Sequence, residues 1–184
     1  MKYNRYIEFL CDLMAIERPF FNFKDNGRFY NDMGAKIEKF ELKPTAKMTT
    51  IPTENTIYVD LDKFTDEIDV YLSLAHEIRH CAQYQALNDV GLWDITTPEM
   101  LKIWAKELQR YKDSTNKGYE NQSIELDAIA FSWLIGRTVF GVEVKANNVN
   151  QDELNKYKQY ISNIFSVGEI KETQDYWGFE YMMH

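Results

Sequence analysis

The spacing of apolar residues along the chain predicts a mostly helical protein. Apolar positions recur every three or four residues in several segments, as they do along one face of an α-helix. One helix is expected to begin after Thr97, because threonine is a suitable N-cap and Pro98 suits the first helical position. The segments predicted to be helical are 3–17, 32–40, 66–87, 98–111, 119–135 and 152–165. The segments predicted to be links, loops or tails are 20–27, 91–98, 112–118, 147–151 and 174–184.

A short β region interrupts the helical pattern. Ala46–Ile51 and Thr56–Leu61 are rich in β-branched residues, and Pro52–Asn55 separates them. These runs predict a hairpin or two short neighbouring strands. The chain has 184 residues and no visible internal repeat, which predicts a single domain over 1–184. The expected fold class is therefore α+β, mostly helical with a small β-sheet.

The predicted helix 66–87 carries a pattern with specific chemistry. The letters HEIRH at His76–His80 have the form H-E-x-x-H, the zinc-binding and general-base pattern of metallopeptidases. Histidines four residues apart lie one turn apart on the same helix face, so both imidazoles can bind one ion. Glu77 follows about 100° around the helix axis. Its carboxylate is therefore expected beside the metal, where it can take a proton from the attacking water.

The two histidines do not belong to the apolar stripe of this helix. The side chains on their face are His76, His80, Asp69, Ser73, Gln83 and Tyr84, opposite the broad apolar face. This arrangement predicts a cleft against a second wall. The alternative is a pair of polar histidines on a solvated helix. Arg79 points away from the metal face and is expected to be structural.

Two histidines and a water leave a tetrahedral zinc site one protein ligand short. The remaining histidine is His184, and the cysteines are Cys11 and Cys81. Cys81 lies on the packing face, where a cysteine is more often a small buried hydrophobe than a ligand. A carboxylate in the largely apolar helix 119–135 is the better candidate, because an acid there needs a partner. Glu125 and Asp127 both qualify, and the alternative for either is a solvated edge or an ion pair with Arg137 or a lysine.

The order of motifs resembles a known group of proteins. H-E-x-x-H followed some tens of residues later by Glu125, Ala128 and Phe131 resembles zincins with a glutamate third ligand. The likeness is strongest to the small bacterial and phage peptidases of the ImmA/IrrE kind and covers about 55–135. It implies that Glu125 is the third zinc ligand and that Asp127 is a neighbour. Ile129 stands where many members carry an acid, so the role of that acid is missing or filled differently.

The resemblance also implies a zincin-like arrangement, with the small sheet packed on the H-E-x-x-H helix. A strand borders the cleft in zincins, and Ile57–Asp60 is the candidate to pair with an extended substrate. A zinc peptidase adds a donor that meets the developing negative charge. Tyr119 is preferred for this role because it precedes the Glu125 helix, and Tyr84 is the alternative.

Composition narrows the remaining classes. A net charge of −8 and a pI near 5.0 argue against nucleic-acid binding, which needs clustered lysine and arginine. No apolar run approaches the roughly 18 residues of a membrane span. The beginning of the chain has no signal-peptide pattern, and two distant cysteines argue against a disulfide framework. A cytoplasmic location is therefore expected, while the oligomeric state is left open.

The motif favours a zinc-dependent endopeptidase acting on a protein or peptide partner. The resemblance to the ImmA/IrrE kind implies that this partner is a regulator and that the protein belongs to a bacterium, prophage or phage. The alternative is a zinc-bound but catalytically inactive domain that regulates or binds proteins, for which Ile129 leaves room. A third hypothesis is a metal-free helical binding domain whose motif is coincidental.

Overall fold

The computed structural model describes residues 2–88, 93–110, 112, 116 and 118–181. Within these residues the chain has the predicted mixed α+β character, with six α-helices and one four-stranded sheet. The helices are α1 (Asn4–Leu13), α2 (Glu67–Asn88), α3 (Pro98–Leu108), α4 (Ser123–Ile135), α5 (Gln151–Ile164) and α6 (Val167–Tyr176). The strands are β1 (Phe20–Asp25), β2 (Arg28–Asn31), β3 (Met48–Ile51) and β4 (Thr56–Asp60).

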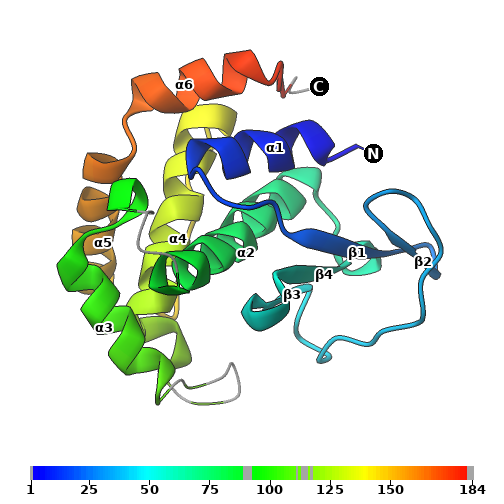
Figure 1. The fold of residues 1–184 in the computed structure, drawn as a ribbon, viewed down its shortest axis with the longest axis horizontal. Helices are drawn as coiled ribbons and strands as arrows, with labels where there is room; N and C mark the ends of the chain where they lie inside the picture. The colour runs from blue at the N-terminus through cyan, green and yellow to red at the C-terminus, as the bar shows by residue number, and fades with distance from the viewer. Residues whose placement is uncertain (1, 89–92, 111, 113–115, 117, 182–184) are drawn as a thin grey trace.

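The sheet lies on one side of α2 and the other helices lie mainly on its other side (Figure 1). The strand order is β2-β1-β4-β3, with β1 parallel to β4 and the two outer pairs antiparallel. Asn26 and Gly27 join β1 to β2 with positive φ angles of 50° and 70°, the backbone that a tight type I′ hairpin requires. The edge strand nearest to α2 is β3, which packs against this helix.

The sheet corrects three sequence predictions. Residues 20–25 are not a link, because they form β1, in which Phe21 and Phe23 point into the core; the turn expected within 24–27 is present at Asn26 and Gly27. Residues 32–40 are not a helix: Gly34 has a φ of 84°, which no right-handed helix allows, and Met33 is 85% exposed. The third correction concerns 57–60, which belong to the inner strand β4. Strands on both sides already pair with β4, so it cannot accept a substrate strand.

The other boundaries agree with the patterns more closely. Thr97 caps α3 by accepting a hydrogen bond from the Met100 amide (3.3 Å), and Pro98 is the first helical residue, as predicted. The predicted strands 46–51 and 56–61 contain β3 and β4. Helix α6 was not predicted, and its residues overlap the expected aromatic tail 174–184. Residues 182–184 of that tail lie outside the described part of the chain.

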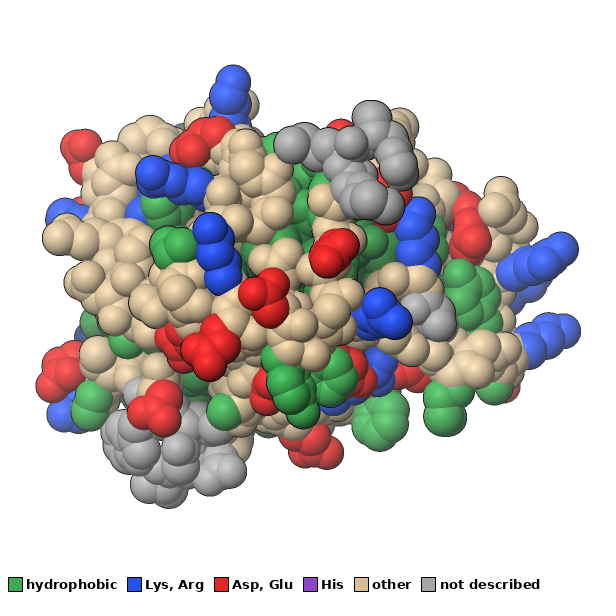
Figure 2. Space-filling model, turned by 90° about the horizontal axis from the view of Figure 1, so that it is seen from above, with side chains coloured by type: hydrophobic (Ala, Val, Ile, Leu, Met, Phe, Trp, Pro, Cys, Tyr) green, Lys and Arg blue, Asp and Glu red, His purple; other side chains and the backbone are tan. Residues whose placement is uncertain are grey.

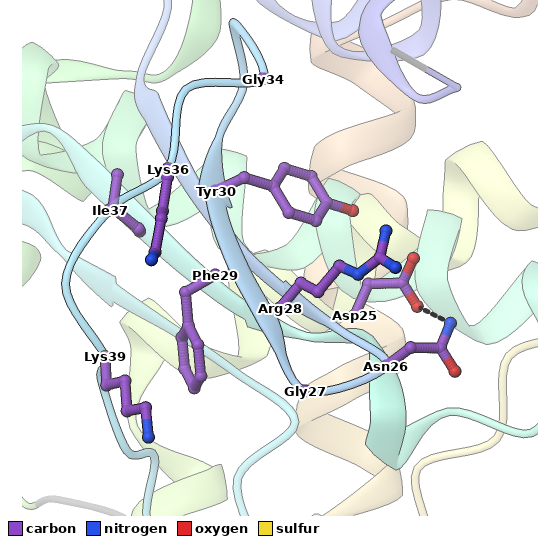
Figure 3. A pocket seen from close by; sticks show the side chains of 10 residues that line it. All are labelled: Asp25, Asn26, Gly27, Arg28, Phe29, Tyr30, Gly34, Lys36, Ile37 and Lys39. Carbon is purple, nitrogen blue, oxygen red and sulfur yellow. Dashed lines mark hydrogen bonds between the residues drawn. The ribbon is translucent and has the colours of Figure 1, made fainter.

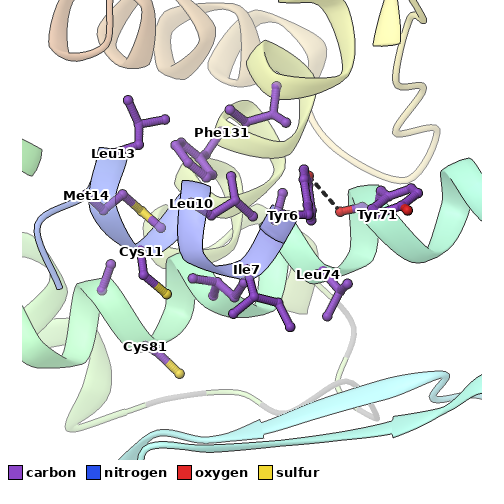
Figure 4. Packing of buried hydrophobic residues seen from close by; sticks show 14 of the residues in the cluster. Tyr6, Ile7, Leu10, Cys11, Leu13, Met14, Tyr71, Leu74, Cys81 and Phe131 are labelled. Atoms are coloured by element: carbon purple, nitrogen blue, oxygen red, sulfur yellow. Dashed lines mark hydrogen bonds between the residues drawn. The ribbon is translucent and has the colours of Figure 1, made fainter. Parts of the chain in front are cut away.

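The apolar core is centred on α1, α2 and α4 (Figure 4). Apolar side chains of α1 pack against α2 and α4. The Tyr6 hydroxyl of α1 donates a hydrogen bond to the Tyr71 carbonyl of α2 (2.9 Å). Phe179, after α6, closes the core, with its ring centroid 4.9 Å from that of Tyr6 and 6.3 Å from that of Phe9. Packing of this kind holds α2 and α4 in a fixed relationship.

The surface seen in Figure 2 carries acidic and basic side chains interspersed with apolar ones. Among the described residues, none of the helices combines the length and apolar character needed to cross a lipid bilayer.

Candidate metal centre

Helix α2 presents its two histidines one turn apart, as the spacing predicted. The Nε2 atoms of His76 and His80 are 3.1 Å apart, and the rings meet edge to face with centroids 4.7 Å apart. Both side chains are partly buried, with 23% and 12% of their surface exposed. The two nitrogens therefore point to one place at the edge of the core.

Helix α4 crosses α2 and brings Glu125 to the same place. One carboxylate oxygen of Glu125 lies 3.6 Å from Nε2 of His76, and the other lies 3.6 Å from Nε2 of His80. Glu125 itself is 1% exposed. A charged group so deeply buried needs partners that compensate for lost hydration, and the two imidazoles are placed to do this.

The position of Glu125 depends on how α4 begins. The Glu107 carboxylate of α3 accepts hydrogen bonds from the amides of Ser123 (3.0 Å) and Ile124 (3.2 Å) and from the Ser123 hydroxyl. The two amides belong to the first helical turn and have no partner within the helix, and a negative charge there also complements the helix dipole. Farther along α4, the Ser132 hydroxyl donates to the Leu72 carbonyl of α2 (2.9 Å). Helix α4 is therefore anchored on either side of Glu125, to α3 before it and to α2 after it.

The charges within this cluster are strongly coupled. Burial acts to lower the pKa of His80, but the Glu125 carboxylate outweighs it and raises this pKa to about 9. Burial acts to raise the pKa of the Glu125 carboxyl, yet the neighbouring histidines hold it well below its usual range. The His80 imidazole and the buried Glu125 carboxylate therefore favour each other's charged form.

The donor atoms of this triad fit a metal ion. The ligating atoms of His76, His80 and Glu125 all lie within 4.8 Å of one another, and imidazole nitrogen with carboxylate oxygen is a common ligand set for divalent transition metals. This is the metal-ligating group of three found within the described ranges. His184 lies outside those ranges.

Asp127 lies away from the triad and has another partner. Its carboxylate accepts hydrogen bonds from Nε of Arg79 (2.7 Å) and from a terminal nitrogen of the same guanidinium (3.1 Å). Both side chains are fully buried. The expectation that Arg79 is structural agrees with this geometry. The ion pair weighed for an acid in this helix therefore exists, with Arg79 in place of Arg137 or a lysine.

Gln83 is a buried residue of the site for which the sequence suggested no role. Its side-chain nitrogen donates to the Ile124 carbonyl (2.9 Å) and to Asp127 Oδ2 (2.7 Å). Its oxygen lies 2.8 Å from Nδ1 of His80. The i,i+3 spacing from His80 was the one available signal. The contacts to α4 depend on tertiary packing and leave no trace in the local pattern.

Glu77 lies beside the triad and outside it. The Thr50 hydroxyl of β3 lies 2.5 Å from Glu77 Oε2 and 3.2 Å from the Glu77 carbonyl. This side chain is shared by two cavities, one of about 740 Å³ that His80 also lines and one of about 370 Å³ that His76 also lines. Open space therefore adjoins Glu77 on the His80 side and on the His76 side of the triad.

The larger of these cavities also contains both tyrosines considered as charge-stabilising donors, Tyr84 and Tyr119. Its remaining wall is mostly apolar and comes from β3, from the segment before it and from the ends of α3 and α4, with Leu42, Met48, Pro52, Leu108 and Ile124. The cavity can therefore enclose a bulky apolar group next to Glu77.

A third cavity, of about 850 Å³, lies away from these residues (Figure 3). It is lined by β1, β2 and the segment after them, including Arg28, Phe29, Lys36 and Lys39. None of the predicted site residues lines it, so its size does not make it the site.

Comparisons of the chain with protein-family models, with curated proteins and with solved structures found no match.

Proposed function

We propose that the protein is a zinc-dependent metallopeptidase with a zincin-like active site, of the kind that the ImmA/IrrE resemblance implies. In this proposal His76, His80 and Glu125 bind the ion and Glu77 is the general base. The observation that carries it is the convergence of the three ligands from two helices, with Glu77 next to them but free of their cluster. A general base in this chemistry must be a carboxylate that does not itself bind the metal.

Each side chain then has a distinct task. Bound zinc supplies Lewis-acid chemistry that lets water ionise near neutral pH. Glu77 accepts the proton of the attacking water and passes it to the leaving amine. The Thr50 hydroxyl, 2.5 Å from one Glu77 oxygen, holds the carboxylate in place and leaves the other oxygen for the water. Tyr119, or Tyr84 from the same cavity wall, donates to the oxyanion.

The substrate in this proposal is an extended segment of a protein or peptide partner. Cavities on both sides of Glu77 give a chain room to cross the site. Strand β3, rather than the inner strand β4, lies at the edge of the sheet beside the larger cavity and can add a substrate strand. The apolar wall near Tyr84 favours a bulky apolar side chain of the substrate at this point.

The proposal is tested first by metal content and then by cleavage. We expect about one zinc per chain in the wild type, and little zinc in Glu125→Ala and His76→Ala, by elemental analysis at known protein concentration. The control is Thr50→Val, which removes the hydrogen bond to the proposed base Glu77 and leaves the three ligands intact. A wild type that takes up no zinc even when zinc is added would overturn the proposal.

Cleavage is measured on fluorescein-labelled casein with zinc-loaded protein. Glu77→Gln is the matched inactive control, because it keeps the ligands and the shape of the side chain but cannot accept the proton. Activity in the wild type that disappears in Glu77→Gln supports a peptidase. Zinc bound without cleavage of casein or of a peptide mixture would favour the alternative, a zinc-containing regulatory or protein-interaction domain.

A further inference from the structure

We infer that Gln83 is a positioning residue that sets the tautomer of His80 and thereby controls metal affinity. The inference rests on the proposed metal site and adds a residue outside the ligand set and the H-E-x-x-H pattern. Gln83 is fully buried, and each polar atom of its amide has a partner.

The partners of Gln83 allow one orientation of its amide. Its nitrogen faces the Ile124 carbonyl (2.9 Å) and Asp127 Oδ2 (2.7 Å), and both of these atoms accept hydrogen bonds. Both oxygens of Asp127 accept hydrogen bonds from Arg79. A rotated amide would turn its oxygen toward two acceptors and lose two buried hydrogen bonds. The amide oxygen must therefore face His80.

This orientation determines which nitrogen of neutral His80 carries the proton. An amide oxygen can only accept, so Nδ1 of His80, 2.8 Å away, has to donate. The lone pair is then left on Nε2, the atom that faces Nε2 of His76 (3.1 Å) and the Glu125 carboxylate (3.6 Å). Gln83 thus presents His80 to the ion in the form that can bind it.

A chain of buried contacts holds Gln83 itself. Arg79, which anchors Asp127, also donates to the Ile95 carbonyl (2.9 Å). The guanidinium lies 5.6 Å from the ring centroids of Trp104 and Phe131. The order of contacts from the core to the metal site is Arg79, Asp127, Gln83 and His80. No side chain or carbonyl among the described residues is hydrogen-bonded to Nδ1 of His76, so this control acts on one histidine only.

Two substitutions separate positioning from simple support of the fold. Gln83→Met removes the acceptor, and we expect the zinc Kd to weaken about 10- to 100-fold. Gln83→Glu keeps an acceptor for Nδ1 of His80 but places a second carboxylate against Asp127. The zinc Kd of Gln83→Glu should stay within about threefold of the wild-type value, because the hydrogen-bond partner of His80 is kept. This variant should unfold at a lower urea concentration than the wild type. Gln85→Met and Gln85→Glu are matched controls, since Gln85 hydrogen-bonds to Glu17 and Asn55 instead.

Zinc affinity is measured on the folded full chain by competition with a chelator, and stability by urea unfolding of the metal-free protein. A second readout is the Nδ1 proton of His80 in the zinc-loaded protein. Its NMR signal should exchange slowly in the wild type and in Gln83→Glu, and rapidly in Gln83→Met. The inference is overturned if Gln83→Met binds zinc like the wild type, or if affinity merely follows the urea midpoint in both variants. Absence of zinc from the wild type itself would instead overturn the proposed function.

Discussion

Arg79 and Asp127 form a bidentate ion pair without solvent exposure, 48 residues apart in the sequence, with hydrogen bonds of 2.7 and 3.1 Å. The pair joins α2 to α4 inside the core, and Gln83 connects Asp127 to His80. Asp127 is not one of the three grouped ligating residues, so the pair fixes the position of α4 and does not bind the ion. Removing one partner leaves an uncompensated charge in the core.

We expect Asp127→Leu and Arg79→Met each to lower the free energy of unfolding by about 3–5 kcal/mol. The double variant Arg79→Met/Asp127→Leu should lose clearly less than the sum of the single losses, because it leaves no buried charge unpaired. Urea unfolding of the four proteins closes the cycle. Additive losses would show that the two side chains act independently.

A second prediction concerns the carboxylate that begins α4. Glu107→Ala should lower the free energy of unfolding by about 1–2 kcal/mol, as the loss of a helix cap does. Glu107→Ala should also weaken zinc binding, because Ser123, which then loses its hydrogen bonds to residue 107, lies in the same helical turn as Glu125. Glu107→Gln keeps one acceptor oxygen, so its stability and its zinc affinity should lie between those of the wild type and those of Glu107→Ala. Chelator competition and urea unfolding measure both effects, and an Ala variant with unchanged metal affinity would contradict the second part.

A third prediction isolates the orientation of the proposed base. Thr50→Val removes the hydroxyl that lies 2.5 Å from Glu77 and keeps the β-branched shape suited to a strand. We expect kcat for casein to fall by roughly tenfold, at the lower end of the value of a hydrogen bond to a charged group. Zinc content should not change. Loss of zinc in this variant would mean that Thr50 supports the ligands and not the base.

A fourth prediction uses the buried thiols. Burial is the main cause that raises the pKa of Cys11 to about 12, and both cysteines are free and buried. A raised pKa reduces the thiolate fraction, which is the reactive form. At pH 8 the folded protein should therefore react very slowly with a disulfide reagent such as DTNB. Two thiols per chain should react at once in 6 M guanidinium, and rapid reaction of the folded protein would contradict this burial.

The parts of the site that the sequence predicted are those fixed by local geometry. His76, Glu77 and His80 lie within one helical segment, so their relation follows from the helix period alone. Glu125 required the resemblance, because residue types in 119–135 could not separate it from Asp127. In the folded chain Arg79 forms an ion pair with Asp127, and this leaves Glu125 as the carboxylate that faces the histidines. Such a choice depends on how two helices cross, and no local pattern records that.

The fold, like the site, was predictable only where the signal lies within one local segment of the sequence. The strands containing Thr50 and Ile57 were visible because β-branched residues cluster there. The alternation of Phe21 and Phe23 also carried a strand signal, but the neighbouring aromatic residues hid it. The false helix at 32–40 came from apolar residues at helical spacing, and Gly34 was the residue that contradicted it. One of the two partners of β1 is β4, a parallel strand more than thirty residues later, and no local signal identifies such a partner.

The contact between α1 and the segment after α6 has a consequence for how the protein is made. Arg5 donates a hydrogen bond to the Gly178 carbonyl across a separation of 173 residues, and Phe179 completes the aromatic packing around α1. At typical rates of synthesis, a ribosome needs about 10–35 s to cover that distance. Throughout this interval α1 has an apolar face without its final cover. The packing around α1 therefore cannot be completed until Phe179 has left the ribosome.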